Sequence, residues 1–301
     1  MGAFISRWFT FFQERFELIG TTLTIAAFFG ANAIVAIGKP QLLATPYPKL
    51  FSAFALIWLV FLHMRLFDEV KDYAFDSEHN PGRPLARGLI SLGEFGLVTL
   101  LVIITEILLA AFNGRETFAA YTILLAFTLL MRMEFFIGDW LRPKLEAYAI
   151  SHTFSASLLG LTTGAAICGV YPFDLDRSFL IFALGNWFIF NVFEFGRKTF
   201  GKEEERVGVD SYSERLRPVG AFALLFANLV IGVALCLLSV SIKFSLPSVL
   251  TISVLVLAGL VTASGILYFQ APTTIKAKIY RGTVTFFLLA YHIAVIAGLL
   301  V

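Results

Sequence analysis

The chain has 301 residues, of which 58% are apolar and only 15% are charged, and its mean hydropathy is +0.82. A soluble domain is typically about half apolar and about one-quarter charged, so this composition excludes one, together with disorder, collagen-like repeats and a small disulfide scaffold. The formal net charge of +2 gives no indication of a nucleic-acid partner. The two cysteines, Cys168 and Cys236, fall inside apolar runs and are predicted to be small packing residues.

Residues 1–16 carry Arg7 and Arg15 among aromatic side chains, which predicts an amphipathic helix in the membrane interface. A cleaved signal peptide is not expected, because no charge-free apolar core precedes a small-residue cleavage site. Long apolar stretches follow, and a transmembrane helix needs about 20 such residues. They predict nine spans, at 17–38, 48–67, 92–112, 116–133, 147–169, 178–196, 218–241, 247–270 and 282–301. We therefore expect an all-α, polytopic membrane protein with one transmembrane domain over residues 1–301.

The basic residues are unequally divided between the two sides of these spans. The amino-terminal segment and the gaps after spans 2, 4, 6 and 8 hold 18 of the 23 Lys and Arg residues, and the other gaps hold 5. The positive-inside rule places the richer side in the cytoplasm. We expect a multi-pass protein of the cell inner membrane with a cytoplasmic amino terminus and Val301 outside.

Eleven of the 21 acidic residues lie in two cytoplasmic segments, 68–78 and 194–214. Acidic residues contribute little to membrane orientation. Their concentration in the polar regions 65–88 and 191–218 therefore indicates a site.

The first polar region continues directly from the second span. If its helix runs on, Asp68, Asp72 and Asp76 recur at i, i+4 and i+8, with Glu69 beside them. Like charges at this spacing repel and destabilise the helix. A bound divalent cation would neutralise this repulsion. Oxygen ligands without a His or Cys pattern suit Mg²⁺, which takes one or two carboxylates and completes its shell with water and phosphate oxygens. We predict that these four acidic residues are metal ligands.

Basic residues follow the acidic stripe closely. Lys71, Arg83 and Arg87 are predicted to contact phosphate oxygens. The alternative is a solvated loop whose charges hold the helix end at the interface. The spacing of the carboxylates and the helix-breaking sequence PGRPLARG favour the site.

At this point the sequence resembles the UbiA superfamily of intramembrane prenyltransferases. That family has an Asn-Asp-x-x-Asp-x-x-x-Asp helix end followed by a loop with Arg-Pro and Gly. Residues 68–76, DEVKDYAFD, match the spacing, with Asp68 in place of Asn and Glu69 in place of the first Asp; Arg83, Pro84 and Gly88 match the loop. The resemblance implies a helical bundle around a central cavity.

The second polar region departs from the family pattern. The family usually has Asp-x-x-x-Asp here, followed by Gly and small residues, and GVDSYS at 208–213 is similar to that tail. Depending on register, the aspartates are replaced by Asn191 and Glu194, or by Lys198 and one of the glutamates at 203–205. We predict Asn191 and Glu194 as metal ligands and Arg197 and Lys198 as diphosphate contacts, because Asn191, Glu194 and Lys198 share one helix face. A salt-bridged surface helix end is the alternative for the glutamates at 203–205.

Other polar residues carry smaller expectations. Arg142 and Lys144 follow the fourth span on the same membrane face, where relatives carry basic residues that contact diphosphate. Glu106, deep in the third span, is expected to hydrogen-bond within the bundle in preference to acting as an acceptor ligand or base. His152 and His292 are expected to be satisfied interior histidines. Two further residues, Asn186 and Trp187, are candidates to line the cavity.

An isoprenyl diphosphate combines a polyanion with an apolar chain. We predict a Mg²⁺-dependent prenyltransferase that ionises such a substrate, with catalytic roles for Asp72, Asp76 and Glu194, and transfers the prenyl group to an aromatic or lipid acceptor. Metal and basic side chains would stabilise the leaving diphosphate, and aromatic rings would shield the carbocation. A UbiA-type terpene cyclase, which needs no acceptor, is the alternative. A transporter is more remote, because no inverted repeat is seen and the charges cluster at one face.

Overall fold

The computed structural model describes residues 2–206 and 209–301, and every regular element in those ranges is helical. The all-α prediction is therefore confirmed. Met1, Val207 and Gly208, which belong to the predicted interfacial helix and the second polar region, lie outside the described residues. The elements are α1 (Gly2–Phe11), the π-helix η1 (Phe12–Phe16), α2 (Leu18–Ala44), α3 (Tyr47–Lys71), α4 (Tyr73–His79), α5 (Leu92–Phe112), α6 (Arg115–Arg132), η2 (Glu134–Phe136), α7 (Gly138–Leu141), α8 (Leu145–Thr153), α9 (Ser155–Cys168), η3 (Pro172–Asp174), α10 (Arg177–Arg197), α11 (Tyr212–Lys243), α12 (Ser248–Gln270) and α13 (Thr274–Leu300).

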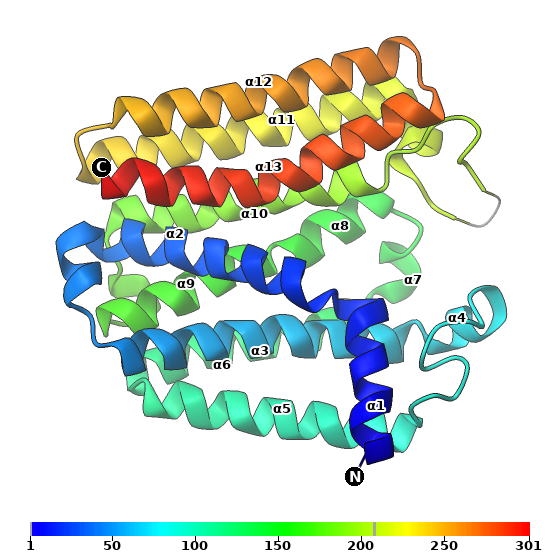
Figure 1. Cartoon of the computed structure of the whole chain (residues 1–301), viewed down its shortest axis with the longest axis horizontal. Helices are drawn as coiled ribbons and strands as arrows, with labels where there is room; N and C mark the ends of the chain where they lie inside the picture. The colour runs from blue at the N-terminus through cyan, green and yellow to red at the C-terminus, as the bar shows by residue number, and fades with distance from the viewer. Residues whose placement is uncertain (1, 207–208) are drawn as a thin grey trace.

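The long helices run side by side, and α1 crosses them near one end of the molecule (Figure 1). Within the described residues, seven helices are long and apolar enough to cross a membrane: α2, α3, α5, α10, α11, α12 and α13. The remaining predicted spans correspond to α6, which has 18 residues including three charged ones, and to the pair α8 and α9. These helices indicate that the chain is an integral membrane protein. The predicted total of nine transmembrane spans remains a prediction.

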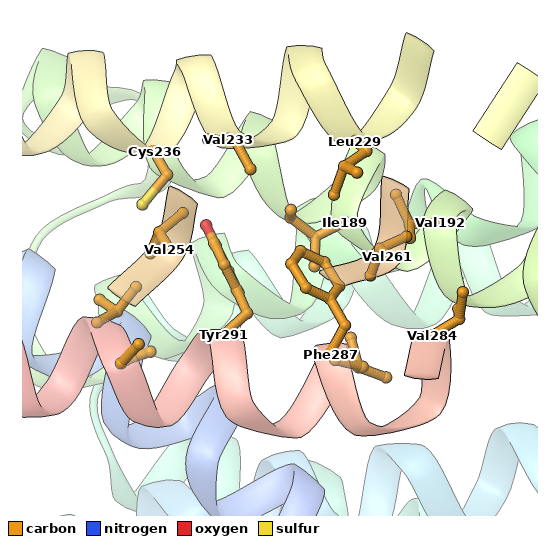
Figure 2. Packing of buried hydrophobic residues seen from close by; sticks show 14 of the residues in the cluster. Ile189, Val192, Leu229, Val233, Cys236, Val254, Val261, Val284, Phe287 and Tyr291 are labelled. Carbon is orange, nitrogen blue, oxygen red and sulfur yellow. The ribbon is translucent and has the colours of Figure 1, made fainter. Parts of the chain in front are cut away.

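Two apolar clusters hold the bundle together. One joins α10, α11, α12 and α13 with part of α2 and α8, and Figure 2 shows its centre, where Ile189, Leu229, Val261 and Phe287 meet. Cys236 is fully buried in this cluster, as its apolar context predicted. The other cluster joins α1, η1, α3, α5, α6 and α9, again with α2. Helix α2 therefore links the two halves.

Proline and glycine interrupt two helices where the sequence predicted span boundaries. Gly38, two residues before Pro40, has φ 75° inside α2, and Arg217, just before Pro218, has φ 60° inside α11. Proline removes a backbone donor and clashes with the preceding turn. The structure therefore has kinks at these two predicted boundaries, while α2 continues to Ala44 and α11 begins at Tyr212.

The predicted span 147–169 is broken at Phe154 into α8 and α9. Polar side chains around the break bond to nearby carbonyl groups: Ser151 to Tyr148, Thr153 to Ala149, and Ser155 to His152. Such bonds compete with the helical ladder. The break exposes a short polar segment to the interior of the bundle.

The first residues pack as a helix against the bundle. The Trp8 indole and the Arg7 guanidinium both donate to the Glu94 carboxylate, at 2.9 and 2.8 Å. Phe11 is buried, whereas Phe9 on the other side is 57% exposed. A residue in the left-handed region, Glu17 at φ 44°, then turns the chain into α2. This packing carries the end of η1 to the interior of the bundle.

Candidate functional site

A cavity of about 510 Å³ opens between the two halves of the bundle, near the ends of α3, α6 and α10. Two of its lining residues, Lys71 and Lys198, stand at the ends of α3 and α10, on the side of the bundle where α4 and α7 are found (Figure 1). Its walls come from η1, α2, α3, α6, α8, α9 and α10. The two predicted polar regions therefore meet at one cavity.

Charged side chains of both signs line the cavity. The basic ones are Arg15, Arg65, Lys71, Arg132, Arg197 and Lys198, and the acidic ones are Asp68 and Glu194. Six bases against two acids leave the described lining with four net positive charges when His152 is neutral. Such a concave, cationic surface favours a polyanion.

Apolar side chains form the inner wall. They include Phe61, Met64, Leu159, Phe190 and Phe193. Phe61 and Lys71 both line the cavity and are ten residues apart on α3, which at 1.5 Å per residue is roughly 15 Å along the helix. The cavity can therefore hold an anionic group and an apolar chain together.

The first acidic motif keeps the helical register that its spacing predicted. The backbone N–H of Asp72 donates to the Asp68 carbonyl at 2.9 Å, and that of Asp76 donates to the Asp72 carbonyl at 2.8 Å. Only Asp68 of these three lines the cavity. Its side chain is 52% exposed, with Lys71 at 3.4 Å. Asp72, at the junction of α3 and α4, is exposed.

The other two carboxylates of this motif are buried against arginines. Asp76 accepts from Arg83 at 2.5 and 2.6 Å. Glu69 accepts from Arg15 at 2.7 Å and from Arg65. Neither acid lines the cavity, and their roles as metal ligands remain predictions. Glu69 has a structural role in this geometry, because its carboxylate holds the Arg15 and Arg65 side chains in the cavity wall.

Three predicted diphosphate contacts follow the motif, and the structure separates them. Lys71 lines the cavity, where its ammonium donates to the Tyr148 hydroxyl at 2.6 Å. Arg83 is paired with Asp76 away from the cavity. Arg87 is paired with Glu14 at 2.9 Å and ties the loop after α4 to η1.

The second motif is partly brought to the cavity. Glu194, Arg197 and Lys198 all line it. Arg197 donates two hydrogen bonds to the Glu194 carboxylate, at 2.5 and 2.9 Å, and Lys198 lies 3.4 Å from it. Asn191 does not line the cavity; it is buried and hydrogen-bonded to Thr153 and Asn228. In this arrangement Glu194 serves as counter-ion to two cavity cations.

The remaining predicted basic contacts lie elsewhere. Arg142 pairs with Glu134 at 2.6 Å, and the Lys144 ammonium lies 3.3 Å from the centre of the Trp140 ring. Neither residue lines the cavity. For these two positions the diphosphate contact remains a prediction without support from the geometry.

The glutamates at 203–205 have structural partners, in line with the alternative considered for them. Glu203 accepts from the backbone and hydroxyl of Thr274 at the start of α13. Glu204 pairs with Arg281 at 2.7 Å. Glu205 accepts from Ser211 and Ser213. These contacts fix the loop after α10 and leave Glu194 as the acidic cavity residue of this region.

Glu106 makes the hydrogen bonds within the bundle that were expected of it. Its carboxylate lies 2.8 Å from His63 Nδ1 and accepts from the Tyr121 hydroxyl at 2.8 Å. The other His63 nitrogen lies 3.0 Å from the Thr128 hydroxyl. This network links α3, α5 and α6 behind the cavity.

Two expectations about interior polar residues are wrong. Asn186 and Trp187 do not line the cavity: Asn186 donates to Asn32, and the Trp187 indole donates to the Ile150 carbonyl. Neither His152 nor His292 is fully satisfied, since the Nε2 atom of each has no hydrogen-bond partner in the described chain.

Several cavity residues were missed in the sequence. The aromatic context of Arg15 predicts a position in the membrane interface, and the positive-inside rule explains Arg65 and Arg132 without a site. Tyr148 carried no expectation. The i, i+4 spacing of Arg65 and Glu69 predicts that these two side chains pair. No sequence pattern predicts the pairing of Arg15 with Glu69, because the two residues are 54 positions apart.

The described residues contain no group of three or more His, Cys, Asp and Glu side chains that could hold a metal ion. Mg²⁺ is often bound by one or two carboxylates together with substrate phosphates and water. Asp68 presents an exposed carboxylate at the cavity, and Asp72 follows one helical turn later. Asp72 itself does not line the cavity, so a Mg²⁺ ion shared between these two carboxylates and a diphosphate remains a prediction.

These features define a polytopic α-helical membrane protein with a charged cavity at one end of its bundle. The fold is similar to that of a digeranylgeranylglyceryl phosphate synthase in membranes, at a TM-score of 0.66 and 16% identity over 98% of this chain and 99% of that one. It is also similar to the apo structure of a UbiA homolog from Aeropyrum pernix K1, at a TM-score of 0.60 and 16% identity over 92% and 96% of the chains. No protein-family model and no curated protein matches the sequence. The chain therefore has a UbiA-like fold, and the resemblance seen in its motifs is confirmed at that level.

Proposed function

We propose that this protein is an intramembrane prenyltransferase that ionises an isoprenyl diphosphate and transfers the prenyl group to an aromatic or lipid acceptor. The observation that carries the proposal is the cavity with a cationic mouth and an apolar inner wall, in a fold similar to that of a digeranylgeranylglyceryl phosphate synthase. The distribution of basic residues supports a location in the cell inner membrane with the cavity open to the cytoplasm.

The cations of the cavity are held in place before substrate arrives. Lys71 is held by Tyr148, and Arg197 and Lys198 are held by Glu194. When the allylic C–O bond breaks, negative charge accumulates on the departing diphosphate. Positive groups that are already oriented stabilise that charge without reorganisation, so these residues lower the barrier to ionisation.

Mg²⁺ would be held by Asp68 and Asp72 and, when bound, would neutralise part of the charge on the diphosphate. Asp76 acts on the site indirectly, through Arg83. The ion pair between these two residues fixes the loop that follows α4. Glu194 keeps Arg197 and Lys198 directed at the cavity. The acidic residues of both motifs thus have roles in positioning as well as in metal binding.

The inner wall accepts the prenyl chain. Phe61, Phe190 and Phe193 supply apolar and aromatic surface there, and aromatic faces stabilise a nearby carbocation. Because the same side chains exclude water, the cation survives until the acceptor attacks it.

The proposal is tested with purified protein in detergent, Mg²⁺ and radiolabelled geranyl, farnesyl or geranylgeranyl diphosphate. We expect turnover only after a membrane-lipid or phenolic extract is added. Release of a cyclic hydrocarbon or alcohol without acceptor would assign a terpene cyclase instead. Failure to consume any diphosphate under either condition would contradict the proposal.

Two arginine variants provide a matched control for this assay. Arg197→Ala removes a cation from the cavity, whereas Arg115→Ala removes one that lies outside it and has no predicted role in the site. We expect loss of turnover in the first and retention in the second.

A further inference from the structure

His152 lies in the cavity wall, at the end of α8 and two residues before the helix break at Phe154. Its Nδ1 is 2.7 Å from the Tyr148 carbonyl oxygen. A carbonyl oxygen only accepts hydrogen bonds, so Nδ1 carries the proton that makes this bond. In the neutral ring, Nε2 is therefore the unprotonated nitrogen and presents a lone pair.

This Nε2 atom is buried and has no hydrogen-bond partner among the described residues. Buried polar atoms are nearly always paired, and an exception calls for an explanation such as a ligand or a catalytic role. Because His152 lines the cavity, a bound molecule can supply the missing partner.

The imidazole ring is fixed in its position. It stacks on Tyr148, with ring centres 4.0 Å apart and planes within 15°, and Phe135 packs edge-on against it. The Tyr148 hydroxyl accepts a hydrogen bond from Lys71. Tyr148 therefore lies between His152 and a cation that is expected to bind the diphosphate. The charged groups around the ring are Lys71 and Asp68 on α3 and Glu134 on η2.

His292 provides an internal comparison. Its Nδ1 also donates to a backbone carbonyl, that of Leu288, at 2.7 Å, and its Nε2 is likewise unpaired. However, it is fully buried and does not line the cavity, and the rings of Phe28, Phe190 and Tyr291 pack around it. The two histidines share a tautomer and differ in access to the cavity.

We propose that His152 is the catalytic base that takes the proton of a hydroxyl-bearing acceptor. This inference rests on the proposed prenyl transfer and deepens it by naming the acceptor's chemistry. The allylic C–O bond breaks with its electron pair leaving on the diphosphate, and a lone pair of the acceptor oxygen forms the new C–O bond. The acceptor proton moves to Nε2 and gives an imidazolium whose Nδ1–H stays bonded to the Tyr148 carbonyl; the proton then passes to solvent. A neutral imidazole is a sufficient base, because the protonated ether formed by attack is a far stronger acid.

The inference is tested by steady-state kinetics on His152→Gln, with His292→Gln as the matched control. General-base catalysis typically contributes at least about 10²-fold. We therefore expect kcat of His152→Gln to fall about 10²-fold while KM for the prenyl diphosphate is unchanged, and we expect no change in kcat for His292→Gln. In His152→Ala, added imidazole and methylimidazoles should restore turnover, with rates that rise with the basicity of the added base. A role limited to packing would not produce that dependence.

The outcomes separate this inference from the proposed function. Wild-type turnover with an equal rate in His152→Gln would overturn the base assignment alone. Absence of wild-type turnover with every diphosphate and acceptor would overturn the prenyl-transfer proposal and this inference with it. If the variants fail to fold, carbethoxylation of the wild-type protein replaces them: loss of turnover on modification of His152 supports the assignment, and retained turnover overturns it.

Discussion

The ammonium nitrogen of Lys71 lies 2.6 Å from the hydroxyl oxygen of Tyr148, and this contact joins the end of α3 to α8 across the cavity. Both residues line the cavity. The nearest carboxylate, Asp68, is farther from the ammonium, at 3.4 Å. A neutral hydroxyl therefore orients this cation and leaves its charge available to a bound anion.

Removing that hydroxyl should weaken substrate binding. A hydrogen bond to a charged group contributes about 1.5–3 kcal/mol, and about 1.4 kcal/mol is a factor of ten in affinity. We expect Tyr148→Phe to raise KM for the isoprenyl diphosphate about tenfold. Tyr171→Phe, which alters an exposed tyrosine outside the cavity, is the control. Equal KM values in the two variants would show that Lys71 does not depend on Tyr148.

Truncation of Asp72 should affect activity, whereas truncation of Glu203 should affect only thermal stability. Asp72→Ala removes a predicted metal ligand at an exposed position, so activity and its Mg²⁺ dependence should be lost with little change in thermal stability. Glu203→Ala removes an acidic group from the start of α13, where a negative charge near a helix N-terminus is favourable. It should lower the unfolding temperature slightly and keep activity. Full activity in Asp72→Ala would overturn the metal-site assignment.

The buried His63–Glu106 pair predicts strong coupling between two substitutions. Glu106→Leu leaves His63 and Tyr121 without their buried partner, which costs about 1–3 kcal/mol. The double variant His63→Leu/Glu106→Leu removes both sides of the pair and should be less destabilised than the sum of the single variants. Thermal unfolding of the four proteins in the same detergent measures the difference. Strictly additive effects would mean that the pair is not formed.

The contact between η1 and the loop after α4 should be sensitive to acid. Hydrogen bonding to Arg87 lowers the pKa of Glu14 below its ordinary value of 4.5. A carboxyl with a lower pKa in the folded state adds stability above its unfolded-state pKa and loses it as the pH falls through its folded-state pKa. Glu14→Gln should thus unfold at a slightly lower temperature than wild type at about pH 6, and this difference should vanish on acidification below 4.5. The effect is small because both side chains are partly exposed. A difference that persists in acid would contradict the assignment.

The sequence predicted helices well because membrane-spanning backbone must satisfy its own hydrogen bonds. Length and apolarity therefore decide where a helix runs, and the span boundaries predicted at Gly38 and Pro218 coincide with kinks inside α2 and α11. The break at Phe154 was not predictable in this way, because α8 and α9 lie within one apolar stretch; polar side chains on both sides of the break bond to nearby carbonyl groups.

The site was predictable as a region but not residue by residue. Asp68 and Glu69 are adjacent and chemically alike, yet one reaches the cavity and the other is buried against Arg15. Asn191 and Glu194 share a predicted face and are similarly divided. Which polar side chain reaches the cavity depends on partners contributed by distant segments, and spacing along one helix does not contain that information.

The position of Arg15 has a practical consequence for preparing this protein. Because η1 carries Arg15 into the cavity wall, trimming the first 17 residues would remove a positive charge from the chamber itself, and a bulky fusion there could distort its rim. The opposite terminus, Val301, is 94% exposed and lies at the far end of the bundle (Figure 1). An affinity tag attached at Val301 would leave the structure of the chamber unchanged. Samples for kinetic work should therefore carry their tag at that end.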